Sequence, residues 1–183
     1  MHGKLLPVYD DSPLLHFPDV PLLHYAMVDA QRFARRQIWY QCFERLKTAD
    51  FGPIQLYRRY HPFDVISDRD LIDVDPAWFS AYKRQGVDVD TIEPGPTEMF
   101  NRDILKWMTD PAIGPRKFAR LTIWDINWND EFQKFTGKLP PVDLSDPRSL
   151  DERMVHRWLA RTQRNHKKIS VRLIQRVLRL VGW

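Results

Sequence analysis

The stretch "DAQRFARRQIWYQCFERLK" (residues 29–47) decides the fold class, because it has the composition and spacing of an amphipathic helix. Asp29 stands directly before the first helical position, where a short acidic side chain commonly caps the free backbone N–H groups. The apolar residues approximate the three-and-four spacing of a buried stripe; they are Phe33, Trp39, Cys42, Phe43 and Leu46. The stretch predicts a helix that ends near Lys47 and turns this stripe toward a core.

Two more helices follow from local signals. The first is predicted between Asp75, which can cap its start, and Gly86, which can end it, with Pro76 at the first helical position. Its apolar residues are Trp78, Phe79 and Tyr82. A third helix must end before Pro111, because proline disfavours helical geometry in the residue before it. Its apolar face consists of Phe100, Ile104, Trp107 and Met108.

The last predicted helix is the longest, and strands are few. Ser149 and Glu152 have the spacing of a capping box, which predicts a long helix through the remainder of the chain. The best strand candidates are Pro21–Met27 and Leu121–Trp124.

With 183 residues, the chain has the length of one domain with an appendage. We therefore expect a mostly α protein with little β structure: a helical domain over residues 1–148, then a basic amphipathic helix over residues 149–183.

Composition bounds the class of protein. An apolar fraction of 43% is too high for a disordered chain, and no run approaches the roughly 18 apolar residues of a membrane span. The first residues do not have the pattern of a secretory signal, which makes the cytoplasm the expected location. Cys42 is the only cysteine, so an internal disulfide and a zinc site built from cysteines are excluded.

The charge is unevenly distributed. From Asp151 onward nine Arg or Lys residues face two acidic ones, a net charge of +7, which leaves −3 of the overall +4 for the preceding residues. Residues 169–183 predict an amphipathic helix that binds an anionic membrane surface, peripheral to the inner face of the membrane, through Arg172, Arg176, Arg179 and Trp183. The alternatives are that its apolar face packs on the acidic body of the chain, or that its charge binds nucleic acid.

Motifs for catalysis are sparse. The chain has no G-x-S-x-G elbow, phosphate-binding G-x-x-x-x-G-K loop, G-x-G-x-x-G or H-E-x-x-H helix. Three D-x-D pairs have the carboxylates that a divalent cation prefers, but aspartates at this spacing also serve as turn and cap residues. The pairs are Asp68/Asp70, Asp73/Asp75 and Asp88/Asp90.

Three stretches together resemble a known family. They are "PLLHYAMVDAQRFARRQIWYQCFERL" (21–46), "NRDILKWM" (101–108) and "RKFARLTIWDINW" (116–128). Their order is similar to that in the C-terminal half of bacterial family 2 glycosyltransferases. In that group an apolar-apolar-His-aromatic run leads into a helix with a Lys/Arg-Gln-x-Trp-Tyr motif, and a Phe-x-x-Leu-x-Ile-Trp segment follows.

The resemblance implies a GT-A fold that binds a nucleotide sugar and holds Mn²⁺ or Mg²⁺ at a D-x-D site. It also implies that His24 lies beside the metal or the diphosphate, as a candidate metal ligand. Residues 1–13 are too few for the strands and the D-x-D site that precede this region in the family. We therefore expect a C-terminal piece that is inactive alone and holds no cofactor alone.

Two classes of function stay open. In the first, the chain is part of a glycosyltransferase that moves a sugar from a nucleotide-sugar donor to a glycan or lipid-linked acceptor, supplying acceptor-side or stabilising structure. The implied reaction is an inverting displacement, in which a carboxylate deprotonates the acceptor hydroxyl and a metal stabilises the leaving diphosphate. In the second, the chain is a non-catalytic module whose basic helix docks on an anionic membrane or on nucleic acid. Nucleic acid is the weaker partner because the tail lacks interleaved aromatic residues.

Overall fold

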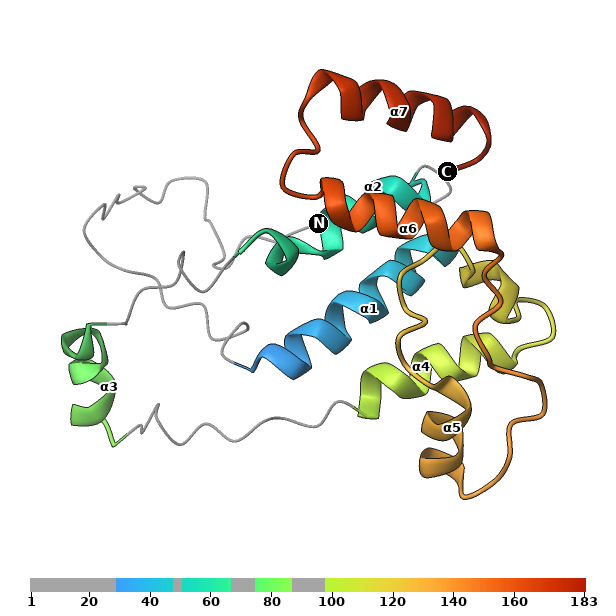
Figure 1. Ribbon diagram of the computed structural model, residues 1–183. Helices are drawn as coiled ribbons and strands as arrows, with labels where there is room; N and C mark the ends of the chain where they lie inside the picture. Colours follow the sequence, from blue (N-terminus) through green and yellow to red (C-terminus); the bar gives the residue numbers. More distant parts are fainter. Residues whose placement is uncertain (1–28, 48–50, 67–74, 87–97) are drawn as a thin grey trace, which may run out of the picture.

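The computed structural model describes residues 29–47, 51–66, 75–86 and 98–183, and within these ranges the chain is helical, with no strand (Figure 1). The α-helices are α1 (Ala30–Lys47), α2 (Pro53–Tyr60), α3 (Ser80–Arg84), α4 (Glu98–Thr109), α5 (Trp128–Thr136), α6 (Leu150–Thr162) and α7 (Ile169–Leu180). Short 3-10 turns are η2 (Pro62–Val65), η4 (Pro76–Phe79) and η5 (Pro115–Phe118). The predicted mostly α class is confirmed.

The helices predicted from caps and spacing are present. The Asp29 carboxylate accepts a hydrogen bond of 2.8 Å from the Arg32 backbone N–H at the start of α1, and α4 ends before Pro111. Asp75 caps η4 by accepting from the Ala77 N–H at 2.9 Å, and α3 continues from η4. Local sequence therefore determines where these helices begin and end.

Two helices were not predicted, although each has a recognisable end. α2 starts with Pro53 directly after Gly52, whose N–H donates to the Gln55 side chain at 3.2 Å. α5 is capped by Asn127 and ends at Gly137, whose φ of 70° lies in the left-handed region that favours glycine. Both helices are short, at 8 and 9 residues, so each spans too few turns for an apolar period to be recognised over the usual window of about 11–18 residues.

The strand prediction for Leu121–Trp124 is wrong, and Pro21–Met27 lies outside the described residues. Residues 121–124 form irregular turns because their backbone N–H and C=O groups form hydrogen bonds with residues close in sequence, and not with a neighbouring strand. The Leu121 N–H donates to the Phe118 carbonyl at 2.9 Å, and the Trp128 indole N–H donates to the Ile123 carbonyl at 2.9 Å. The apolar side chains of this segment still enter the core.

The prediction of a single long C-terminal helix is also wrong, because the chain turns back between α6 and α7 (Figure 1). The Gln163 side chain, just after α6, donates to the carbonyls of Arg58 at 3.3 Å and His61 at 3.1 Å. The reversal brings α7 alongside α6 and lets Trp183 reach a cluster on α2 and α6. Contacts with distant residues thus outweigh the helix propensity of residues 163–168.

The described core has two clusters of buried residues. The larger joins α1, α2, α4, α5 and the segments between them; its fully buried members include Cys42, Leu56, Ile104, Met108, Phe118, Leu121, Ile123, Trp128 and Leu144. The smaller holds α6 and the C-terminus against α2 through Ile54, Tyr57, Leu159 and Trp183. The candidate site lies where elements from both clusters meet.

Candidate functional site

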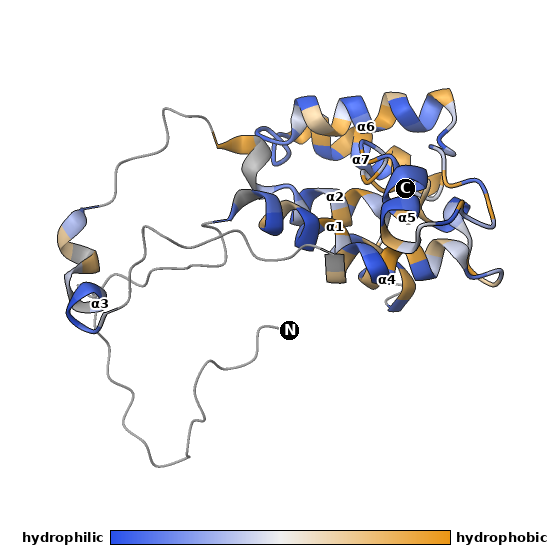
Figure 2. Cartoon of the chain, turned by 90° about the horizontal axis from the view of Figure 1, so that it is seen from below, coloured by the Kyte–Doolittle hydropathy of each residue, from blue (hydrophilic) through white to orange (hydrophobic). Residues whose placement is uncertain are grey.

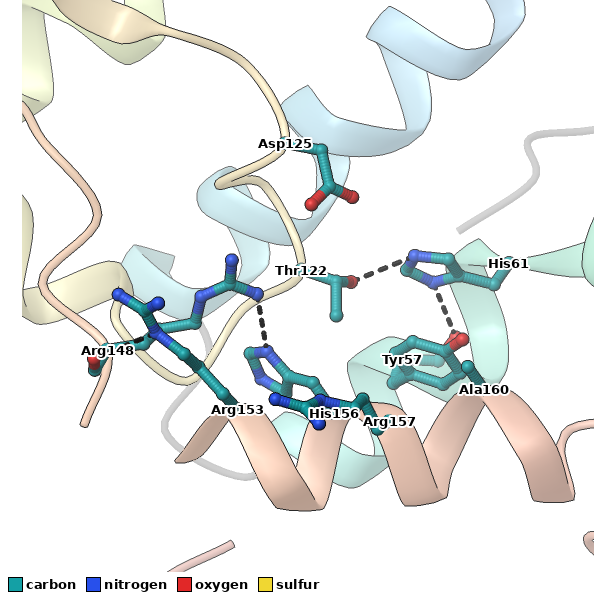
Figure 3. A pocket seen from close by; sticks show the side chains of 9 residues that line it. All are labelled: Tyr57, His61, Thr122, Asp125, Arg148, Arg153, His156, Arg157 and Ala160. Atoms are coloured by element: carbon teal, nitrogen blue, oxygen red, sulfur yellow. Dashed lines mark hydrogen bonds between the residues drawn. The ribbon is translucent and has the colours of Figure 1, made fainter. Parts of the chain in front are cut away.

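Two pockets meet at His61, Thr122 and Asp125, which line both. The first, here called the arginine pocket, has a volume of about 450 Å³ and is completed by Tyr57, Arg148, Arg153, His156, Arg157 and Ala160 (Figure 3). The second, the glutamine pocket, has a volume of about 230 Å³ and is completed by Phe33, Ala34, Gln37, Ile38, Gln41, Tyr60 and Pro62. The shared residues make the two pockets neighbouring halves of one site.

His61 is held in one orientation at the C-terminal end of α2. Its ring stacks on Tyr57, with 4.0 Å between ring centroids and 12° between planes, and its Nδ1 lies 3.0 Å from the Tyr57 carbonyl oxygen. Because a carbonyl can only accept, Nδ1 must carry the proton. Nε2 lies 2.8 Å from the Thr122 hydroxyl oxygen (Figure 3). In the neutral imidazole Nε2 is an acceptor, so the single Thr122 hydroxyl proton is donated either to Nε2 or to the Gln41 side-chain oxygen.

Thr122 and Asp125 come from the irregular segment that precedes α5. The Thr122 hydroxyl also lies 3.3 Å from the Gln41 side-chain oxygen, which links this segment to α1 as well as to α2. Asp125 is exposed and has no hydrogen bond or ion pair within the part of the chain that the structure describes. Of the described residues it is the only carboxylate that lines the two pockets, so it is available to accept hydrogen bonds from a ligand.

The arginine pocket carries positive charge that its surroundings neutralise only in part. Arg148 is fixed by two parallel hydrogen bonds to Asp146, of 2.8 and 2.9 Å, and Arg153 lies 3.4 Å from the same carboxylate. Burial opposes the charge on Asp146, but the hydrogen bonds and charges of Arg148 and Arg153 hold its pKa below the usual value. Arg157 has no anionic partner among the described residues. An anion is the ligand that this charge balance favours.

His156 lines the arginine pocket beside Arg148. Its Nδ1 accepts a hydrogen bond of 3.0 Å from the Arg148 guanidinium, and its ring lies edge-on to that of Trp183, with 5.4 Å between the ring centroids. Burial lowers the pKa of His156 to about 4, and the positive charge of Arg148 acts in the same direction. The imidazole is therefore neutral near pH 7 and adds no charge to the pocket.

A second basic pocket, of about 460 Å³, lies near the start of α6 and is lined by Arg45, Ile113, Arg116, Lys117, Ala119, Arg120 and Glu152. Glu152 is buried and accepts from Arg116 at 3.1 Å and from the Ser149 backbone N–H at 2.9 Å. The Ser149–Glu152 capping box is thus confirmed. This carboxylate holds the end of α6 to the η5 turn.

The site residues predicted from the sequence fall into three groups. His24 lies outside the described residues, as do all members of the D-x-D pairs except Asp75, which is a cap. Trp183 is not a surface residue: it is 6% exposed and packs in the smaller cluster, so its place at a membrane boundary is corrected. The three predicted membrane-binding arginines are exposed, and they are Arg172, Arg176 and Arg179.

Sequence reasoning did not single out His61, Thr122 or the arginine pocket. Thr122 and Asp125 stand within the stretch "RLTIWD" that contributes to the family resemblance, so that stretch was the available signal. His61 has no motif around it. Its importance comes from Thr122, which is 61 residues away in the chain.

The residues present do not fit a divalent metal site. Within the described ranges no three His, Cys, Asp or Glu side chains lie close enough together to hold a metal ion. In the pockets both nitrogens of His61 are engaged, which leaves Asp125 as a single oxygen ligand. No chemical step is therefore assigned to a metal held by these residues.

No protein-family model, curated protein or solved structure matches this chain. Its function must therefore be argued from the site. Two of the stretches that carry the family resemblance meet there: α1 contributes Gln37 and Gln41, and the segment after η5 contributes Thr122 and Asp125.

Proposed function

We propose that this chain supplies the acceptor-side structure of a glycosyltransferase, and that the joined pockets bind an acceptor glycan bearing a phosphate or similar anionic group. One observation carries the proposal. Two family-like stretches, "RQIWYQ" (36–41) on α1 and "FARLTIW" (118–124) before α5, contribute to one pocket. They are joined by the hydrogen bond between Gln41 and Thr122, which are 81 residues apart.

The glutamine pocket has the groups that sugar hydroxyls require. A hydroxyl both donates and accepts, so it pairs well with a carboxylate on one side and an amide on the other. Asp125 is the acceptor, and Gln37 lines the same pocket with an amide that can donate. Tyr60 adds an aromatic surface, partly buried and stacked on Tyr40 with 5.7 Å between centroids.

The arginine pocket suits the anionic part of the same ligand. Planar guanidinium groups bind phosphate oxygens through paired hydrogen bonds, and fixing Arg148 on Asp146 reduces the entropy lost on binding. Arg157 contributes a charge with no described partner. Because His61 and Thr122 line both halves, a sugar and its phosphate would span them side by side.

The proposal assigns a limited part of the reaction to this chain. Asp125 would accept a hydrogen bond from the acceptor hydroxyl and orient it, while the arginines would position the phosphate. Donor binding and stabilisation of the leaving diphosphate are assigned to structure outside the described residues, which contain neither a sheet nor a three-ligand metal group.

The test is an NMR titration of the chain with glucose 1-phosphate, mannose 1-phosphate, free glucose, inorganic phosphate and UDP-glucose. We expect a hexose 1-phosphate to shift the side-chain amide signals of Gln37 and Gln41, with a Kd on the order of 1 mM. Asp125→Asn and Arg157→Gln should each weaken binding about tenfold, the loss of one charge-assisted hydrogen bond. Lys138→Gln, which also removes one positive charge but in an exposed loop after α5, is the matched control for Arg157→Gln.

Three outcomes would contradict the proposal. If no hexose phosphate binds, the pocket has no acceptor role. If inorganic phosphate binds as tightly as the sugar phosphates and Asp125→Asn has no effect, the site recognises an anion without a sugar. Micromolar one-to-one binding of UDP-glucose would make this a donor site instead.

A further inference from the structure

One side of α7 faces the body of the protein. Val171 and Gln175, four residues apart, are buried, and Leu178 completes the same face by packing on the smaller core cluster. With its amide oxygen turned toward α2, Gln175 accepts from the Arg58 Nε at 3.2 Å. α7 therefore has a fixed orientation on the molecule, alongside α6 at its outer edge (Figure 1).

The opposite side of α7 is apolar and exposed. Six large aliphatic residues on it and at its end are between 46% and 86% exposed: Ile169, Leu173, Ile174, Val177, Leu180 and Val181. Among the residues that the structure describes, this apolar face does not pack on the chain's own body, which was one alternative, because the body contacts the other face. An aliphatic strip of this size on a helix marks a surface that is covered by something else.

A basic stripe borders the apolar face. Arg172, Arg176 and Arg179 follow each other at steps of four and three, so they lie on one side of the helix, and all three are exposed. Lys167 and Lys168 are exposed in the turn just before α7. No Asp or Glu occurs among residues 153–183, so every charged Asp, Glu, Lys or Arg side chain in this segment is basic. Repulsion within the stripe is relieved by an anionic surface.

We infer that α7 lies in the headgroup region of an anionic membrane, with its aliphatic face toward the acyl chains and its arginine stripe against lipid phosphates. An apolar face next to a basic one is the arrangement of a helix that lies in a membrane surface. No helix among the described residues is long and apolar enough to cross a bilayer, and hydrophilic and hydrophobic residues alternate along the helices (Figure 2).

Charge and side-chain type favour this occupant over two others. A second copy of the chain would bring two strongly basic tails together, whereas lipid phosphates oppose the charge. Nucleic acid would pair with the arginines but leave six aliphatic side chains exposed, because no aromatic residue on this face can stack on bases.

Point variants test this better than removal of residues 169–183. Such a deletion would also remove Trp183, which is buried against Ile54, Tyr57 and Leu159, and would uncover the smaller cluster. The apolar variant is Leu173→Ser with Val177→Ser. The charge variant is Arg172→Gln, Arg176→Gln and Arg179→Gln.

The experiment is co-sedimentation of the full chain with vesicles of phosphatidylcholine, or of phosphatidylcholine and phosphatidylglycerol in equal parts. We expect binding to the anionic vesicles only, weakened by salt. The charge variant should lower the partition coefficient about a hundredfold, because each basic residue near the surface contributes roughly fivefold. The apolar variant should lower it about tenfold or more.

Matched controls carry the same changes elsewhere. Leu139→Ser with Val142→Ser removes an exposed leucine and an exposed valine distant in sequence from α7. The triple variant Arg32→Gln, Lys106→Gln and Lys138→Gln removes three exposed charges. Both should bind as the parent chain does, and thermal melting of every variant should show an unchanged fold.

The inference is overturned if neutral and anionic vesicles bind alike, or if the controls lose as much binding as the variants. It is also overturned if the apolar variant binds normally, since the arginines would then act as a diffuse charge without insertion of α7. A stable dimer in the absence of lipid, lost in the apolar variant, would make the face an interface between two copies. Binding to an RNA oligonucleotide more tightly than to anionic vesicles would also overturn it.

Discussion

Arg58 and Gln163 each cap the helix to which the other belongs. Arg58, on α2, donates from Nη1 to the Leu159 carbonyl at 2.8 Å and to the Gln163 side-chain oxygen at 2.8 Å, at the C-terminal end of α6. Gln163 donates to the carbonyls of Arg58 and His61 at the C-terminal end of α2. Each helix end thus receives side-chain donors for carbonyls of its last turn, where backbone N–H donors run out.

This reciprocal cap should stabilise the fold and hold His61 in the site. We expect Arg58→Ala and Gln163→Ala each to lower the free energy of unfolding by about 1.5–3 kcal/mol, since each leaves partly buried acceptors without donors. Urea denaturation measures both, and the double variant should cost clearly less than the sum of the two, because the residues share one network. Additive losses would show that the two caps act independently.

The lowered pKa of His156 predicts that the stability of the fold depends on pH. Its pKa of about 4 in the folded protein lies below the 6.5 of an exposed histidine, so between these values the unfolded chain binds a proton that the folded chain does not. Stability should be unaffected by this group above pH 6.5 and should fall, by about 3 kcal/mol in all, as the pH drops to about 4. Arg148, Glu152 and Asp146 are the charged groups that act on it.

His156→Gln keeps an acceptor for Arg148 without a titrating ring. Its plot of unfolding free energy against pH should be flatter than that of the parent between pH 6.5 and 4. The pKa values of Asp146 and Glu152 are lowered, because their hydrogen bonds outweigh the opposing effect of burial. Their contributions to stability are therefore lost only at lower pH. An unchanged slope in His156→Gln would contradict the assignment.

Short-range chemistry accounts for what could be predicted. Asp29, Asp75 and the Ser149–Glu152 pair are signals that act over two or three residues, and each marks a helix start in the structure. The break between α6 and α7 has no such signal, because it depends on Gln163 reaching residues more than 100 positions earlier.

The candidate site could not be predicted from the sequence because it too depends on contacts between residues far apart in the chain. Its central hydrogen bond joins His61 to Thr122 across 61 residues, and neither stands at a spacing that predicts chemistry. Likewise, the sequence does not specify which face of α7 is buried: a wheel places the arginines together, but Val171 and Gln175 face the body only because Arg58 and the α2–α6 cluster lie there.

Cys42 should be unreactive in the folded protein. It is fully buried in the larger core cluster, and burial raises the pKa of its thiol, so both access and thiolate formation are suppressed. We expect Ellman's reagent at pH 8 to modify the native chain at least about a thousandfold more slowly than the chain in urea, since reaction requires unfolding. Comparable rates in the two conditions would show that α1 opens locally.

Trp183 and Leu180 are close in sequence but should differ strongly in their effect on stability. The indole is 6% exposed, packs with Ile54, Tyr57 and Leu159, and has the Arg120 guanidinium over its face at 5.4 Å, whereas Leu180 is 86% exposed. Trp183→Ala should lower the free energy of unfolding by about 3–5 kcal/mol, the usual cost of removing a buried tryptophan, and Leu180→Ala by less than about 0.5 kcal/mol. Denaturation curves in urea give both values.

Because α7 is fixed to the body through Trp183, Trp183→Ala should also weaken vesicle binding, while Leu180→Ala should weaken vesicle binding without loss of stability. Equal and small stability losses for the two variants would mean that the C-terminus does not anchor α7.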